Sequence, residues 1–148
     1  MNAAEEWEWR FVCFKSRREP NPVQEWFDGL PDEVQDEIRD LLQHLRVKIN
    51  SKWQRPAFDP LVREGGIISE LRPRQVPCEE NGEVRTYTCR IYGFFGPKGH
   101  KHSYTFLHGN DKGNVRDDVD GKLTAKDRFG QIEREEATVQ EFKEWPDS

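Results

Sequence analysis

The sequence predicts a small α+β domain, and three observations favour that fold class. Strand-forming residues dominate positions 9–14, and two segments follow whose apolar residues recur every three or four positions. Beyond residue 66, apolar runs alternate with turn-rich stretches. The chain has 148 residues, enough for one domain spanning 1–148, and we expect its core over about residues 9–132.

The first half of the chain predicts a strand and a helical hairpin. Residues 9–14, WRFVCF, are typical of a strand. Pro22 suits the first turn of a helix that Gly29 ends. A second helix is predicted from about Pro31 to Lys48 because it carries an apolar stripe at helical spacing, made of Val34, Ile38, Leu41, Leu42 and Leu45. The joined apolar face of these helices needs a sheet to cover it.

The second half predicts a sheet and a C-terminal helix. Residues 52–66 are rich in Pro and Gly and are expected to form a loop, followed by strands at 67–72, 84–95 and 103–110. Turn-rich stretches separate these strands, so an antiparallel meander is the simplest connection. A helix is expected at about 124–134, and a last helical turn is weakly indicated near 138–142.

The charges are unevenly distributed. The net charge is -5, but residues 51–116 carry 11 Lys and Arg against 7 Asp and Glu, and both flanks are acidic. From Val84 to Arg116 the only acid is Asp111, which faces six cations. Each cation alone is explained by a solvent-exposed position on a strand, but the cluster of six favours an anionic partner.

Several classes of protein are disfavoured by the sequence. It contains no run of 18 apolar residues and its first residues are acidic, so we expect neither a membrane partner nor a signal peptide, and a cytoplasmic location. The cysteines are odd in number and form no CxxC pair, which leaves only a Cys78–Cys89 bridge open. The histidines of GHKH at 99–102 lack further ligands, and no nucleotide-loop pattern occurs, so we expect no metal and no cofactor.

Side-chain alternation divides the three predicted central strands between two faces. One face, expected to lie under the helices, takes Ser69, Leu71, Cys89, Ile91, Thr105 and Leu107. The other takes Glu70, Arg72, Arg90, Tyr92, Tyr104, Phe106 and His108. A one-residue bulge in any strand would break this assignment, and Gly93 and Gly109 are places where one is possible.

Four segments, in this order, resemble the phage-derived, HigB-like branch of the RelE/ParE toxin superfamily. They are LPDEVQDEIRDLLQHLR, ISELRP, YTCRIYGFF and YTFLHGNDKG, and the similarity covers roughly residues 9–132. The resemblance implies two helices packed on a twisted antiparallel sheet whose concave face is the working surface. It also implies a messenger RNA endoribonuclease that acts on the ribosome and is blocked by a cognate antitoxin, here expected to be a helix-turn-helix protein. The acidic composition, the long loops at 74–82 and 96–102 and the single Lys112 depart from the family pattern.

The predicted catalytic residues are Arg72, Arg90, His108 and Tyr92. Cleavage without a metal needs a base for the 2′-hydroxyl, an acid for the leaving oxygen and stabilisation of charge at phosphorus. Arg72 and Arg90 suit the last task because guanidinium grips phosphate with two N–H groups. His108 is the expected acid or base, although a strand-end histidine often only bonds a carbonyl. Tyr92 is expected to stack on a base or assist proton transfer, or else to be buried in the sheet.

Further phosphate contacts are predicted from Lys112, Arg74, Lys101 and Lys126, each of which has a solvated surface role as its alternative. Two other functions remain open on the same fold. The net acidity favours a non-catalytic binding module or a gyrase-directed poison, as in the ParE branch, because an acidic surface competes poorly for RNA. A phage structural or accessory protein would use the scaffold without its chemistry.

Overall fold

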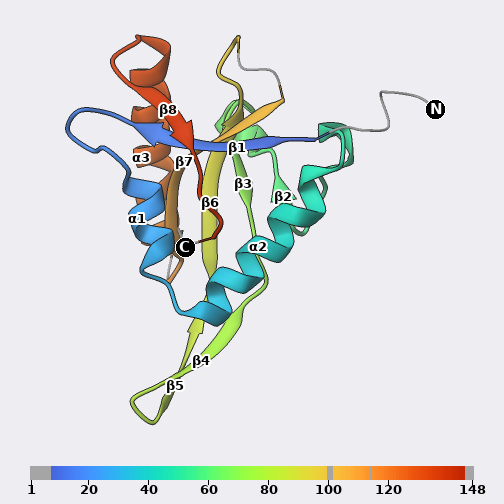
Figure 1. Ribbon diagram of the computed structural model, residues 1–148, viewed down its shortest axis with the longest axis vertical. Helices are drawn as coiled ribbons and strands as arrows, with labels where there is room; N and C mark the ends of the chain where they lie inside the picture. Colours follow the sequence, from blue (N-terminus) through green and yellow to red (C-terminus); the bar gives the residue numbers. More distant parts are fainter. Residues whose placement is uncertain (1–7, 100–101, 114, 146–148) are drawn as a thin grey trace.

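The computed structural model describes residues 8–99, 102–113 and 115–145, and it has the predicted α+β class. Helices α1 (Pro22–Asp28) and α2 (Asp32–Arg46) lie on one face of the main sheet, and α3 (Val115–Glu133) lies on the other (Figure 1). The predicted first strand and helical hairpin are confirmed. The sheet therefore forms the middle layer and is buried on both faces.

The main sheet runs in the order β2-β3-β6-β7-β1-β8. Its strands are β1 (Arg10–Lys15), β2 (Phe58–Asp59), β3 (Ser69–Leu71), β6 (Cys89–Phe95), β7 (Ser103–Asp111) and β8 (Thr138–Glu141). The predicted antiparallel meander is confirmed for β3, β6 and β7. The prediction of a wholly antiparallel sheet was wrong, because β1 pairs with β7 in parallel.

Three predicted elements differ from those in the structure. The expected strand at 84–95 is interrupted at Thr88, and its first part, β5 (Glu83–Tyr87), pairs with β4 (Val76–Glu80), which lies in a stretch predicted as turn. This hairpin projects from the body of the domain (Figure 1). The segment at 138–142 is largely strand β8 rather than helix because it pairs with the edge of β1. Helix α3 begins at Val115, well before the expected start at Thr124.

The loop predicted at 52–66 contains short elements that shape one side of the sheet. They are η2 (Asn50–Lys52), β2 and η3 (Val62–Glu64). Cys13, Cys78 and Cys89 are buried free thiols, so the Cys78–Cys89 bridge is not formed.

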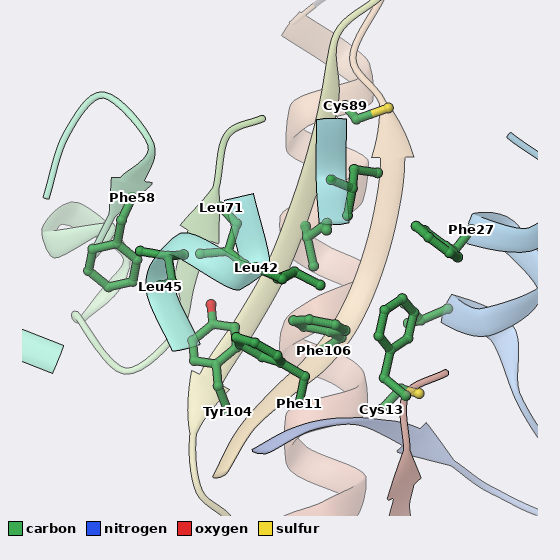
Figure 2. Packing of buried hydrophobic residues seen from close by; sticks show 14 of the residues in the cluster. Phe11, Cys13, Phe27, Leu42, Leu45, Phe58, Leu71, Cys89, Tyr104 and Phe106 are labelled. Atoms are coloured by element: carbon green, nitrogen blue, oxygen red, sulfur yellow. The ribbon is translucent and has the colours of Figure 1, made fainter. Parts of the chain in front are cut away.

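The larger core joins α1 and α2 to the sheet. Residues Val34, Ile38, Leu42 and Leu45 of α2 are buried, as their spacing predicted. Figure 2 shows side chains of this core, with Phe11 and Phe106 side by side and stacked at 5.5 Å between ring centroids. A second cluster on the opposite face joins α3 to Tyr92, Phe94 and Leu107.

A bulge overturns part of the predicted division between faces. Tyr92 pairs with His108, but the next residue, Gly93, pairs with Phe106, which leaves Leu107 as the extra residue of β7. Tyr104 and Phe106 therefore lie in the core under α1 and α2, and Leu107 lies in the cluster under α3. Their predicted faces were wrong because alternation fails at a bulge.

Candidate functional site

All of the predicted catalytic residues share the sheet face on which α3 packs. Glu70, Tyr92 and His108 are direct neighbours across β3, β6 and β7. Arg90 lies two residues from Tyr92 and so points to the same face. Arg72 follows β3, and its guanidinium reaches Glu70. These residues therefore share one face, away from α1 and α2, where Arg72 and Arg90 meet at Glu70 and His108 lies beside Tyr92.

Glu70 is a buried carboxylate that joins the two arginines. Its side chain is 2% exposed, with Oε2 3.1 Å from Arg72 Nη2 and Oε1 3.0 Å from Arg90 Nε. Arg72 Nη2 also donates to Asp59 Oδ2 at 2.7 Å. The Arg90 N–H is not directed at the carboxylate oxygen, so this contact is an ion pair without a hydrogen bond. Two guanidinium groups from adjacent strands thus converge on one anionic group.

Tyr92 is buried beneath α3. Its hydroxyl donates to Asp118 Oδ1 at 2.8 Å, and Lys122 Nζ lies 3.1 Å from Asp118 Oδ2. A Cβ at Gly121 would lie 2.7 Å from Tyr92 Cε2, so only glycine lets α3 approach this closely. Burial, followed by the bond to Asp118, raises the pKa of Tyr92. The tyrosine is therefore a poor acid in this arrangement and has no open face for a base.

His108 is held as a neutral hydrogen-bond acceptor. Arg128 Nη1 lies 3.2 Å from His108 Nδ1, and since arginine can only donate, Nδ1 is unprotonated and the proton sits on Nε2. Arg128 also donates to the Leu107 carbonyl at 2.8 Å and to Glu19 at 2.7 Å. Burial, and then the charge of Arg128, lowers the pKa of His108 to about 4. At neutral pH the ring is uncharged and has no proton to give as a general acid of ordinary strength.

The predicted substrate-binding residues do not gather at one place. Lys112 is half-buried just beyond β7, close enough for its charge to act on Asp118. Arg74 is exposed and lines a cleft of about 450 Å³ between α2 and residues 72–74. Lys126 pairs with Glu64 of η3. Lys101 lies outside the described residues.

The partners of the predicted residues are what sequence reasoning missed. Glu70 was placed on the right face, but nothing in its position in ISELRP indicates a buried bridge between arginines. Arg128 had one available signal, because it falls in line with Gly121, Ala125 and Ile132 on the buried side of α3. An arginine in such a stripe predicts a buried guanidinium with polar partners.

In the described ranges, no group of three or more His, Cys, Asp and Glu side chains is arranged to hold a metal ion. Among the helices of the same residues, none combines the length and apolarity that a membrane crossing requires.

The chain matches no protein-family model, and comparisons with curated proteins and with solved structures found no match. None of these comparisons identifies a toxin family, and the resemblance is one of the four sequence segments alone.

Proposed function

We propose that the protein is the toxin of a type II toxin-antitoxin system and cleaves messenger RNA on the ribosome without a metal. The observation that favours this function is the convergence of Arg72 and Arg90 on the face opposite α1 and α2. A phosphodiester carries its extra negative charge at phosphorus during cleavage, and paired guanidinium groups are suited to stabilise it. The side chain of Arg72 is 32% exposed and that of Arg90 is 16% exposed, so their outer N–H groups are partly reachable.

The proposal assigns separate roles to the residues of the face. Arg72 and Arg90 stabilise the developing charge while the 2′-oxygen attacks the adjacent phosphorus and the bond from phosphorus to the 5′-oxygen of the next nucleotide breaks. His108 accepts the hydroxyl proton at Nδ1 once the Arg128 side chain has moved away, because that nitrogen now accepts from Arg128. The products are a 2′,3′-cyclic phosphate and a 5′-hydroxyl, whose oxygen takes its proton from solvent, to which His108 then returns the proton it accepted. Tyr92, buried against Gly121, positions the face rather than contacting the substrate. Lys112, whose charge acts on Asp118 of the same face, would contact a neighbouring phosphate.

The partners of the proposed toxin follow from the resemblance alone. A cognate antitoxin of the helix-turn-helix class would neutralise it, and the ribosome would present the transcript, which places its action in the cytoplasm.

The test is induction in a bacterial host with mapping of RNA 5′ ends. Wild-type protein should stop growth and leave new ends within coding regions. Arg90→Lys keeps the ion pair with Glu70 but loses the guanidinium fork, so it should reduce both effects at unchanged protein level. Arg116→Ala is the matched control, because that side chain is 88% exposed on α3. Intact transcripts at high expression of wild-type protein would refute the proposal.

A second candidate is a non-catalytic binding module, including a gyrase-directed poison. It is favoured by the pairing of the cations on this face inside the chain. Arg72 and Arg90 bind Glu70, Lys126 binds Glu64 and Arg128 binds Glu19. Growth arrest with DNA damage signalling and uncut transcripts would select the gyrase-directed version.

A further inference from the structure

A cleft that shares Arg72 with the strand-borne arginine pair lies between η3, the end of β3 and α3. Its volume is about 690 Å³, within the range of about 300–1,000 Å³ typical of small-molecule sites. Its lining consists of Arg55, Asp59, Leu61, Val62, Arg63, Glu64, Arg72 and Lys122. Three of its basic side chains thus come from residues 55–72, and the fourth, Lys122, comes from α3.

Several N–H groups at this cleft have no partner among the described residues. Arg72 uses Nη2 for both of its carboxylates, and no contact of Nη1 occurs there. Arg55, whose side chain is 72% exposed, also uses only Nη2, toward Asp59 at 3.2 Å. The exposed side chain of Arg63 makes no hydrogen bond or ion pair in the described part of the chain. The cleft therefore offers donors from three guanidinium groups to an added anion.

The acids of the cleft are already engaged in the fold. Asp59 accepts from the Leu61 backbone N–H at 3.0 Å and binds both Arg55 and Arg72. Glu64 pairs with Lys126. Four cations and two carboxylates line the cleft, which leaves two net positive charges in a chain whose net charge is -5. A doubly charged anion would balance this local excess.

The cleft is held in shape before any ligand arrives. Asp59 fixes Arg55 and Arg72 on one side and caps a turn in which Leu61 has a φ of 52°, a conformation that costs a non-glycine residue about 1–3 kcal/mol. Leu61 and Val62 also add an apolar strip beside the guanidinium groups. Cations beside an apolar strip suit a ligand that joins a phosphate to a flat, weakly polar ring.

We infer that this cleft binds a phosphate monoester carried by a nucleoside, with the phosphate at Arg55, Arg63 and Arg72 and the ring against Leu61 and Val62. A free mononucleotide and the 5′-phosphorylated end of an RNA present the same group. The inference goes beyond the proposed function and does not require cleavage. It shares Arg72 with the proposed nuclease face and uses N–H groups of this side chain other than Nη2, which binds Asp59 and Glu70.

The experiment is calorimetric titration of the purified protein with AMP, adenosine and inorganic phosphate at low ionic strength. AMP should bind, and adenosine should bind at least about tenfold more weakly, because it lacks the charged group. The double variant Arg55→Ala/Arg63→Ala should weaken AMP binding about tenfold or more, and both residues are exposed enough to leave the fold intact. Arg116→Ala should leave binding unchanged.

Short oligoribonucleotides with and without a 5′-phosphate separate the two sources. Binding of AMP alone, or of both AMP and the 5′-phosphorylated oligonucleotide, supports the inference and identifies the natural ligand class. Equal binding of both oligonucleotides would show recognition of the RNA backbone and would overturn the monoester assignment. The absence of heat up to about 10 mM AMP would also overturn it. AMP binding by a protein that leaves transcripts intact would refute the nuclease and leave this site standing.

Discussion

The half-buried imidazole of His108 predicts that the protein loses stability in mild acid. Its pKa is lowered to about 4 in the folded chain, against an ordinary value of 6.5. At a pH between these two pKa values, His108 is protonated in the unfolded chain but not in the folded one. The free energy of unfolding therefore falls as the pH falls. The stabilisation is complete above pH 6.5 and is lost as the pH drops from 6.5 toward 4. Linkage over these two pKa values gives a loss of about 2 kcal/mol between pH 7 and pH 4.5.

Urea unfolding followed by tryptophan fluorescence at pH 7, 6, 5 and 4.5 measures this loss, because Trp9 and Trp53 are buried in the core. With a slope of about 2 kcal/mol per molar urea, the midpoint should fall by about 1 M. His108→Gln keeps an acceptor for Arg128 but does not titrate, so most of the fall should disappear.

The pH dependence of His108→Gln separates the contribution of this histidine from those of other titrating groups. Asp59 and Asp118 also have lowered pKa values, but their contributions lie at lower pH and remain in the variant. His44→Gln, at an exposed position, should keep the wild-type dependence. An identical pH dependence in wild type and His108→Gln would refute the reasoning.

Two further substitutions test the sheet around the site. Glu70→Ala leaves the guanidinium of Arg90 partly buried without a carboxylate, and it should cost about 3–5 kcal/mol in urea unfolding, while the exposed control Glu133→Ala should change little. A cost for Glu70→Ala below about 1 kcal/mol would contradict the bridging role. Gly93→Ala puts a Cβ 2.4 Å from the Thr105 carbonyl oxygen and 2.5 Å from the buried Tyr104 ring, so thermal unfolding should show a loss of about 3 kcal/mol. Gly29→Ala, whose nearest contact would be 3.5 Å, should be nearly neutral, and an equal loss in both variants would contradict the steric argument.

The elements that the sequence predicted well are those whose own residues determine them. Helices α1 and α2 carry an apolar face at regular spacing and have Pro and Gly near their ends, so local pattern is enough. The first half of α3 was missed because its buried side holds Asp118 and Gly121 while Val119 and Leu123 are exposed. Such a helix is positioned by a close approach to the sheet and by polar bonds, which leave no apolar period in the sequence.

The candidate site was predictable up to the point where long-range partners enter. Alternation along β3 and β6 was sufficient to place Arg72, Arg90 and Tyr92 on one face. It could not show that Glu70 would join the arginines, because this contact depends on how β3 and β6 pair. It also could not show that Arg128 would bond His108, because this contact depends on how α3 packs on β7. His108 was therefore expected to titrate near neutrality, whereas the structure makes it a half-buried, neutral hydrogen-bond acceptor.

The bulge at Gly93 explains how β7 serves two faces with such different residues. Without it, His108, Phe106 and Tyr104 would point the same way, and either the histidine would enter the aromatic core or two large rings would be pressed against α3. The extra residue, Leu107, lets the strand give His108 to the α3 side and the two rings to the core under α1 and α2. Gly93 has no side chain, and this leaves the space that the Tyr104 ring fills. The bulge thus lets both rings pack in the larger core while His108 stays beside Tyr92. The packing of this core therefore positions the candidate site.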